Sequence, residues 1–357
     1  DDPLLPLGLV RRTEARVRRI VVLGGLGFFG GAAAELLRSK GARPLLASRR
    51  PGADIRVDAE DRASIQVGLR PGDVVLDAAG PYQRRTTALL EGAVEGGFDV
   101  VDLNEDLGYA ERVLALRSRI EAAGIRVLAG CSSVSAISAA AVRRSGIAAP
   151  VRVDVFLAPA SRFTARPSTG AALLASVGRA IRVWRDGRLS GATGWSESRA
   201  FDFPPPVGRL RGWLMESADS LHLPAVWPSL RGVAFWVDTH APGTNAMFAA
   251  AVRRPLLRRI LERGQPLGLA LARRFGAKAS TLGFEIARPE GPAVRIALAA
   301  RERGYLAPIV PASLAVKALA EDRFGPGGLV PVDRQVDPDL LFRELASVGL
   351  TVVEARP

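Results

Sequence analysis

The sequence contains very little material for disulfides or metal sites. Among its 357 residues are one cysteine, Cys131, and two histidines, His222 and His240. A single cysteine excludes an internal disulfide and fits a reducing compartment, so we expect a cytoplasmic protein. One cysteine and two histidines far apart in sequence are poor material for a zinc site, and we predict no bound metal.

Lysine is scarce although the chain is strongly basic. Only three of the 49 basic residues are lysine, and the formal net charge is +13. The arginines are spread along the whole chain in ones and twos, whereas nucleic-acid-binding proteins gather basic residues on one face or tail. We therefore expect no nucleic-acid partner, and instead a long-range attraction for anionic ligands.

Apolar runs long enough to cross a membrane are also missing. The best candidate, residues 20–34, has five glycines and is followed by Glu35, so a strand, a tight loop and a helix explain it better than a membrane span. Residues 1–16 are polar and contain proline, and we interpret them as a loose arm.

The first 145 residues alternate between two sequence periods. Short runs rich in valine and isoleucine predict buried parallel strands over residues 18–23, 44–47, 55–57, 73–77, 98–103 and 125–128. Amphipathic stretches predict helices over residues 28–39, 61–69, 85–95, 107–122 and 134–144. This alternation predicts an α/β fold with a Rossmann-type, doubly wound parallel sheet.

After residue 150 the pattern becomes that of an α+β domain. Strands are expected over 151–157 and 233–238, hairpins over 181–195 and 281–301, and helices over 168–178, 243–263 and 265–274. The prolines at 204–206 are expected to break the chain. We predict a dinucleotide-binding domain over 17–148, an inserted α+β domain with a mainly antiparallel sheet over 149–305, and a tail over 306–357. The helices of the tail and its final strand, residues 350–354, are expected to return to the first domain.

A glycine-rich loop carries the strongest functional signal. Gly25, Gly27 and Gly30 form a G-x-G-x-x-G pattern, with Phe28 and Phe29 between the second and third glycine. The loop follows a valine-rich strand and opens an amphipathic helix, which is the context of a dinucleotide site. Gly25 is expected to permit the tight turn, Gly27 the approach of the pyrophosphate, and Gly30 close packing. The alternative is a glycine-rich turn without a ligand.

The end of the second predicted strand bears on the choice of nucleotide. NAD sites usually place an acidic residue there for the ribose hydroxyls, but this chain has Ser48, Arg49 and Arg50. A hydroxyl and two guanidinium groups suit a 2′-phosphate, so we expect NADP(H) rather than NAD(H). The alternative is a pair of solvated surface arginines.

The end of the fourth predicted strand continues into Ala79, Gly80 and Pro81. Ligands of open α/β sheets lie beyond the carboxyl ends of the strands. We therefore expect these small residues to pass close to the ribose and nicotinamide of the cofactor. A simple Gly-Pro turn is the alternative.

Candidates for a catalytic proton donor are few. Tyr82 lies beside the expected nicotinamide end, and Asp102, with Asn104, follows the fifth strand toward the same crevice. His240 ends a strand of the second domain, and His222 falls in a polar segment expected to be a loop. We predict Tyr82, Asp102 and His240 as catalytic candidates, with a structural role as the alternative for each.

Cys131 raises a different possibility. It lies between the sixth predicted strand and a helix, and a helix N-terminus lowers the pKa of a thiol. A Cys131-dependent acyl or aldehyde reductase is therefore an alternative function. A small buried thiol in a tight loop is the simpler interpretation.

Several segments together resemble the saccharopine dehydrogenase-like family. They are VVLGGLGFFG, LLASRR, VVLDAAGPYQ, VVDLNED, IRVLAGCSSVSA and, in the tail, GYLAPIVPASLAVKALAEDRF, GGLVPVD and LLFRELASVGL. The resemblance implies a split Rossmann domain that the tail helices complete, and an inserted α+β domain that carries substrate contacts and dimerises. It also implies NAD(P)-linked redox chemistry at a C–N centre of an amino-acid-like substrate.

These observations converge on an NADP(H)-dependent oxidoreductase of saccharopine dehydrogenase type. We expect hydride transfer to or from a C=N, C=C or C=O group of a small metabolite, and a homodimer formed through the second domain. A non-catalytic NADP(H)-binding sensor or assembly subunit is the alternative from another functional class.

Overall fold

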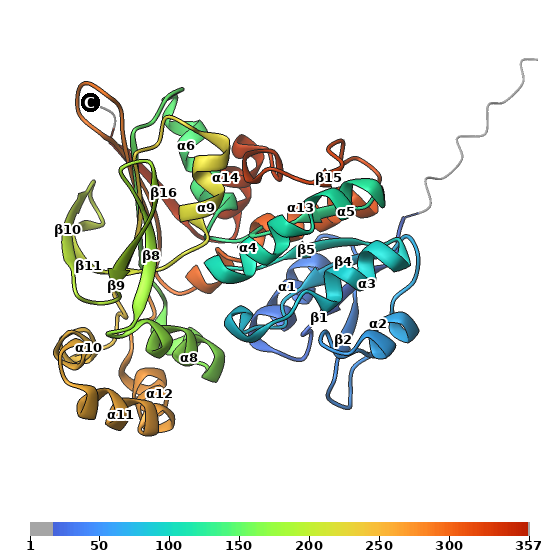
Figure 1. The fold of residues 1–357 in the computed structure, drawn as a ribbon, viewed down its shortest axis with the longest axis horizontal. Helices are drawn as coiled ribbons and strands as arrows, with labels where there is room; N and C mark the ends of the chain where they lie inside the picture. The colour runs from blue at the N-terminus through green and yellow to red at the C-terminus, as the bar shows by residue number, and fades with distance from the viewer. Residues whose placement is uncertain (1–16, 356–357) are drawn as a thin grey trace, which may run out of the picture.

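The computed structural model describes residues 17–355, so the predicted arm over residues 1–16 lies outside the described residues. Figure 1 shows two sheets side by side, a parallel sheet that begins at the blue N-terminal end and a mixed sheet coloured largely green to red. No helix of residues 17–355 is both long and apolar enough to cross a membrane.

Seven parallel strands form the first sheet, in the order β15-β6-β5-β4-β1-β2-β3. The three central strands, β1 (Ile20–Leu23), β4 (Val74–Asp77) and β5 (Asp99–Asp102), are buried along their whole length. Uninterrupted apolar sequence suits such strands, because helices cover both faces of a parallel sheet. The other strands are β2 (Leu45–Ser48), β3 (Ile55–Arg56), β6 (Arg126–Leu128) and β15 (Gly328–Leu329). This order confirms the predicted Rossmann-type sheet.

Helices pack on both faces of this sheet. On one face, α1 (Phe28–Ser39) packs against α13 (Val310–Ala320), which comes from the tail and contacts β4 and β5. The other face carries α2 (Arg62–Gly68), α3 (Ala88–Gly96), α4 (Leu107–Ala115) and α5 (Arg117–Ala122). The helix predicted over residues 107–122 is therefore two helices, interrupted at Leu116.

The second sheet has nine strands and is antiparallel except for one pair. Its main path is β10 (Ser198–Phe203), β11 (Gly208–Met215), β12 (Gly232–Val237), β7 (Arg152–Ala158), β13 (Ser280–Ala287), β14 (Val294–Ala300) and β16 (Thr351–Ala355). β8 (Ala180–Arg185) and β9 (Arg188–Thr193) form a hairpin attached to β12. The predicted mainly antiparallel sheet is confirmed, with β7 and β12 as the parallel pair.

Both predicted hairpins are present, and a third was missed. The β8–β9 turn uses Asp186 and Gly187 at φ of +51° and +76°, as an Asp-Gly turn requires. The prolines at 204–206 do not break the chain but lie in the turn of the β10–β11 hairpin. Proline pre-sets the backbone for a turn as readily as it ends an element, and the sequence does not distinguish the two.

The last strand was expected in the first domain, and this expectation is wrong. β16 pairs antiparallel with β14, with Val353 opposite Ala297 and Val352 opposite Leu298. The pairing covers the outer edge of β14, which would otherwise present unpaired backbone groups. β15, which was not predicted as a strand, does join the parallel sheet, beside β6. The tail therefore contributes to both sheets.

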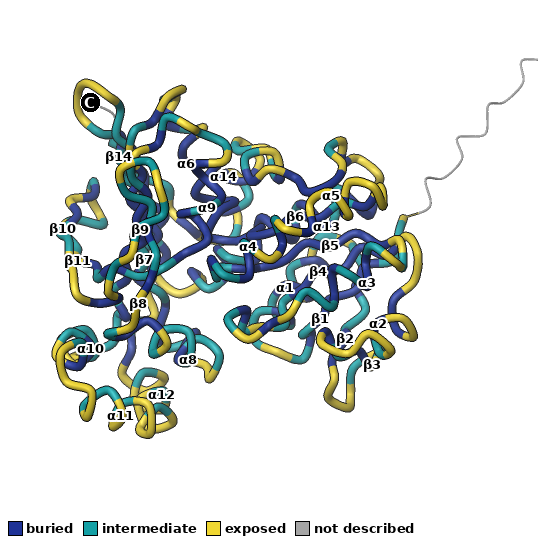
Figure 2. Tube along the Cα trace, in the orientation of Figure 1, coloured by how far each residue is buried: buried dark blue, intermediate teal, exposed yellow. Residues whose placement is uncertain are grey.

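The helices that accompany the second sheet form two groups. α6 (Ala136–Ser145), α9 (Asp219–Val226) and α14 (Pro338–Ser347) are packed together, and α6 contacts β13 and β14. α6 and α14 were expected in the first domain, whereas their buried residues join the hydrophobic core of the second sheet. At one end lie α7 (Ser161–Thr164), α8 (Pro167–Ser176), α10 (Thr244–Val252), α11 (Pro255–Arg263) and α12 (Gln265–Phe275). The helix predicted over 243–263 is broken before Pro255, because proline restricts the preceding residue and lacks an N–H. α11 and α12 bury no residue and are largely yellow in Figure 2.

Candidate functional site

The glycine loop turns sharply between β1 and α1. Gly24 adopts a φ of +77°, and a side chain there would lie 2.8 Å from the carbonyl oxygen of Ala78. The tight turn therefore falls at Gly24, whereas the sequence had predicted it at Gly25. A Cβ on Gly30 would lie 2.3 Å from the Gly24 carbonyl oxygen, so only glycine fits where α1 crosses the loop.

The N-terminus of α1 is open to a ligand. Gly27 is its N-cap, and no side chain caps it. The first turn contains no acidic residue, whose carboxylate would compete with a phosphate for the free N–H groups. Phe29 lines a cavity that also contains Gly80 and Pro81, whereas the ring of Phe28 packs on Tyr305 at 5.3 Å and under the Arg166 guanidinium. This geometry fits a pyrophosphate above the loop.

Arg50 connects the end of β2 to the glycine loop. Its Nη2 donates to the carbonyl oxygen of Leu26 at 2.8 Å, and its backbone N–H donates to Ser48 Oγ at 3.1 Å. Ser48 is buried, and Arg49 and Arg50 are exposed. Two guanidinium groups and a hydroxyl are thus gathered where the adenosine ribose lies in Rossmann-type sites.

The loop after β4 is fixed by a buried ion pair. Arg85 Nη2 lies 3.1 Å from Asp77 Oδ2, and Arg85 Nη1 donates to the Ala79 carbonyl oxygen at 2.8 Å. The backbone N–H of Ala79 also donates to Asp77 Oδ1 at 3.0 Å. Gly80 and Pro81 line the cavity beyond this clamp. The structure therefore places these predicted cofactor contacts at the mouth of the cavity.

The Tyr82 hydroxyl is held in a structural role, which argues against the predicted proton donor. It donates to the carbonyl oxygen of Asp77 at 2.6 Å and accepts from the backbone N–H of Leu103 at 3.1 Å. It thereby ties the end of β4 to the end of β5. Burial raises the pKa of Tyr82 well above its ordinary value. Tyr82 therefore lines the cavity with atoms other than this hydroxyl oxygen.

Asp102 is fully buried and does not line the cavity. Its Oδ1 accepts from the backbone N–H groups of Gly130 at 2.7 Å and Asn104 at 3.0 Å, whereas Oδ2 has no hydrogen-bond partner among the described residues. Burial raises the pKa of Asp102 to about 7. The side chain joins the ends of β5 and β6, so the structure gives it a positioning role rather than contact with a substrate.

The two histidines lie outside the cavity. His240 is in a shallow depression with Asp238 and Asn245, and its Nδ1 lies 3.1 Å from the Ala279 carbonyl oxygen. His240 was predicted as a catalytic candidate, and its position outside the cavity argues against that role. His222 is not in a polar loop but on α9, with Nδ1 2.8 Å from the Oγ of Ser135. Burial lowers its pKa to about 4, which keeps it neutral.

Cys131 is fully buried, in a short bridge with Ser135. Burial raises the pKa of its thiol well above the ordinary value, with the Asp102 carboxylate adding to the effect. A reactive thiol needs the opposite, a lowered pKa and access to the substrate. The structure thus opposes the acyl reductase alternative.

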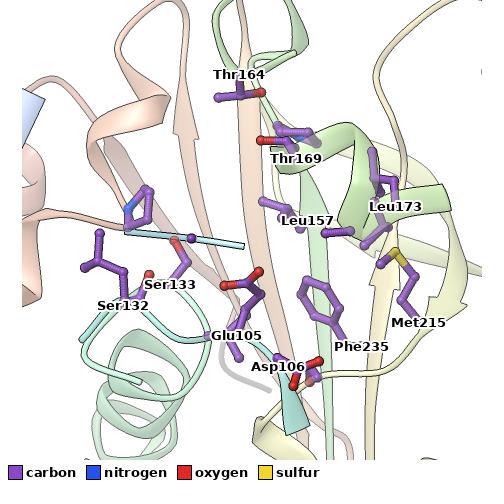
Figure 3. A pocket seen from close by; sticks show the side chains of 18 of the residues that line it. Glu105, Asp106, Ser132, Ser133, Leu157, Thr164, Thr169, Leu173, Met215 and Phe235 are labelled. Atoms are coloured by element: carbon purple, nitrogen blue, oxygen red, sulfur yellow. The ribbon is translucent and has the colours of Figure 1, made fainter. Parts of the chain in front are cut away.

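A cavity of about 380 Å³ lies between the two domains. The ends of β4 and β5 and the loop over residues 132–134 form one wall. Leu157, Leu173 and Phe235 of the second domain belong to the opposite wall. Figure 3 shows Glu105 between Ser133 and Phe235, with Asp106 beside it. The walls are mostly apolar, as is usual in small-molecule sites.

Glu105 is the titratable residue that sequence reasoning missed. Its Oε1 accepts from Gln83 Nε2 at 3.3 Å, and no arginine, lysine or histidine of residues 17–355 pairs with it. Burial raises the pKa of Glu105 to about 7. Its position three residues after Asp102 at the end of β5 was the available signal, because side chains beyond a strand end converge on the ligand crevice.

Comparisons with known proteins concern the fold. No family model and no curated protein matches the sequence. Among solved structures, apo histidine-tagged saccharopine dehydrogenase (L-Glu forming) from Saccharomyces cerevisiae matches with a TM-score of 0.58 at 15% sequence identity, over 95% of this chain and 100% of that chain. The chain has the saccharopine dehydrogenase fold.

Two further matches are less similar in shape. GenD2 from gentamicin A biosynthesis, solved in complex with NAD, matches at 18% identity and a TM-score of 0.42, over 98% of this chain and 100% of that chain. An engineered D-amino acid dehydrogenase bound to NADP+ matches at 13% identity and a TM-score of 0.42, over 91% of this chain and 95% of that chain.

Proposed function

We propose that the chain is an NADP(H)-dependent oxidoreductase acting on a C=N, C=C or C=O group of a small metabolite. One observation carries the proposal: the glycine loop and the uncapped N-terminus of α1 lie beside a mostly apolar cavity. Bound NADP(H) supplies or accepts a hydride, and the protein positions both reactants and excludes water.

Three parts of the chain hold the nucleotide in this proposal. The first-turn N–H groups of α1 receive the pyrophosphate, and the close packing of Gly24 and Gly30 leaves room for it. Ser48, Arg49 and Arg50 receive the 2′-phosphate. Residues 79–81 lie at the nicotinamide end. The bond from Arg50 to the Leu26 carbonyl oxygen supports this placement, because it brings a guanidinium group to the rim of the loop.

Glu105 is the proton-handling group of the cavity in this proposal. Because burial raises its pKa to about 7, both its charged and its neutral form are available near neutral pH. It can give a proton to a reduced carbonyl or alkene, or act as counter-ion to a positively charged nitrogen. The alternative of a non-catalytic NADP(H) sensor predicts nucleotide binding without turnover of any substrate.

Arginine substitutions test the choice of nucleotide. We expect Arg50→Ala and Arg49→Ala each to weaken NADPH binding about tenfold or more, since a hydrogen bond between charged groups contributes about 1.5–3 kcal/mol. NADH lacks the 2′-phosphate, so its affinity should change less than about twofold. Arg209→Ala, at a guanidinium 75% exposed in the second sheet, removes the same charge and serves as the control. Equal losses for both nucleotides would contradict the assignment.

Homodimerisation through the second domain also belongs to the proposal. α11 and α12 leave Leu256, Ile260, Leu267, Leu271 and Phe275 exposed. Several exposed arginines flank these side chains, so a self-contact there should strengthen as salt screens their repulsion. Sedimentation velocity at low and high salt tests this, and a monomer in both would contradict it. The single buried cysteine supports a cytoplasmic location, which cell fractionation would test.

A further inference from the structure

The charges that line the cavity are of one sign. Glu105, Asp106 and Glu216 all contribute to its walls. None of the described residues that line it is arginine, lysine or histidine, although the chain contains 49 basic residues and carries a net charge of +13. The charged side chains that line the cavity are therefore opposite in sign to the net charge of the chain.

The three carboxylates differ in how far the protein neutralises them. Asp106 caps α4 by accepting from the backbone N–H of Tyr109 at 2.7 Å. Glu216 accepts from the backbone N–H of Arg182 at 2.7 Å, and the Arg182 guanidinium lies 3.7 Å away. Among the described residues, the one side-chain donor to the Glu105 carboxylate is the neutral amide of Gln83. Glu105 is the carboxylate left to pair with a ligand.

A second polar group of the cavity lining has no hydrogen-bond partner among the described residues. Ser217 is 1% exposed and lines the cavity, and its Oγ makes no hydrogen bond in the part of the chain that the structure describes. A buried hydroxyl left unpaired costs free energy, so such groups usually have a ligand or water as partner. Ser217 Oγ can accept from an N–H of a bound molecule.

From these groups we infer that the substrate is an apolar molecule with one positively charged nitrogen, an amine or its iminium form, and that it carries no carboxylate or phosphate in the cavity. This inference rests on the proposed oxidoreductase function and names the substrate class of that site. Glu105 is the counter-ion, Ser217 accepts from the nitrogen, and Leu157, Leu173 and Phe235 pack on the carbon skeleton.

An anionic substrate would meet no basic side chain among the described residues that line the cavity. Burying a charge without a partner costs several kcal/mol, and three carboxylates would add repulsion. At the N-termini of α4 and α6, one N–H each already donates to an acidic side chain, Tyr109 to Asp106 and Ser135 to Asp219.

With this substrate class, Glu105 acts as counter-ion, and the hydride step itself takes no proton from Glu105 or from any other side chain. When a hydride reaches a positively charged C=N group, a C–H bond forms at carbon and the π electron pair becomes the lone pair of nitrogen, while the reduced nicotinamide is oxidised. The reaction balances without a proton from the protein. This agrees with a Tyr82 hydroxyl committed to Asp77 and Leu103 and with His240 outside the cavity.

Three small ligands of similar shape test the inference by calorimetry: benzylamine (cation), benzyl alcohol (neutral) and benzoate (anion), with and without saturating NADPH. We expect benzylamine to bind about tenfold or more tighter than benzyl alcohol, the gain of one charged hydrogen bond, and benzoate to bind more weakly than both. Glu105→Gln should abolish the advantage of benzylamine and leave benzyl alcohol within about twofold. Glu302→Gln, at an exposed carboxylate outside the cavity, removes the same charge and should change nothing.

Two results would overturn the inference: benzoate binding as tightly as benzylamine, or no binding of any of the three at their solubility limits. Titration of NADPH alone reports separately on the proposed function. A benzylamine preference without NADPH binding would keep the cavity assignment and remove the oxidoreductase function. NADPH binding with a benzoate preference would do the reverse.

Discussion

Replacing Asp102 by asparagine should stabilise the protein selectively at alkaline pH. The buried carboxyl has a pKa of about 7 in the fold, raised by burial from an ordinary 3.8. Between these values the folded state binds a proton that the unfolded state has lost, so the stability of the wild type falls as pH rises toward 7. Asparagine keeps the oxygen that accepts from Gly130 and Asn104 but cannot ionise.

The size of the effect follows from the width of the pH window. Between about pH 5 and about pH 7 the folded carboxyl keeps its proton, whereas the unfolded carboxyl is already ionised. Each of these two pH units lowers the free energy of unfolding of the wild type by about 1.4 kcal/mol. The free energy of unfolding of Asp102→Asn relative to wild type should therefore rise by about 3 kcal/mol between these two pH values. Any constant cost of fitting the amide cancels in this difference.

Urea unfolding of both proteins at the two pH values measures this difference. Asp202→Asn, at a side chain 73% exposed, is the matched control and should show no pH-dependent gain. Glu105 and Asp219, whose pKa values burial also raises, are present in both proteins and cancel. A stability of Asp102→Asn relative to wild type that is unchanged or lower at the higher pH would refute the claim that burial raises the pKa of Asp102.

Three further substitutions probe the site. Gly30→Ala places a Cβ 2.3 Å from the Gly24 carbonyl oxygen and should weaken NADPH binding at least about tenfold, whereas Gly31→Ala, with its nearest atom at 3.5 Å, should bind normally. Equal affinities by fluorescence titration would argue against the loop as the nucleotide site. Tyr82→Phe removes a buried hydroxyl that bonds to Asp77 and Leu103, while the Leu103 N–H keeps the Asp77 carbonyl oxygen at 3.2 Å, and it should lower the free energy of unfolding by about 0.5–1.5 kcal/mol in urea, with no change in the pH profile of turnover. Loss of a limb of that profile would restore Tyr82 as a proton donor. Cys131→Ser should retain turnover, and the native thiol should react with a maleimide far more slowly than the unfolded one. An inactive serine variant would favour the acyl reductase instead.

Local sequence patterns predicted the parallel sheet well, because each part of it has a short-range signature. The valine-rich runs of β1, β4 and β5 are buried strands, and Asp61, the first residue of the helix predicted over 61–69, accepts from the backbone N–H of Ala63 at the start of α2. These signals lie within a few residues of the element that they define. The β8–β9 turn at Asp186 and Gly187 is of the same kind.

The errors concern contacts between residues distant in sequence. Nothing in the sequence of residues 351–355 shows that their partner is β14 rather than the parallel sheet. The motif pattern placed the tight turn at Gly25, but the φ of +77° belongs to Gly24, because the turn is set by the approach of Ala78 from β4. Pairing across strands of different domains has no local signature.

The sequence predicted the region of the candidate site but not which side chains face its cavity. The strand-end rule led to the crevice that this cavity occupies and passed over Glu105, which lies in it, whereas it selected Tyr82 and Asp102, whose polar atoms point into the protein. Side-chain direction after a strand end depends on tertiary hydrogen bonds. His240 was chosen because histidine is rare in this chain, and rarity carries no information about position.

Titration of the purified wild-type protein with NADPH and NADH tests the central claim most directly. We expect one nucleotide site per chain, with NADPH bound about tenfold or more tighter than NADH through Ser48, Arg49 and Arg50. Absence of binding by either nucleotide would contradict it, because the open N-terminus of α1 and the packed glycine loop would then be features of the fold alone.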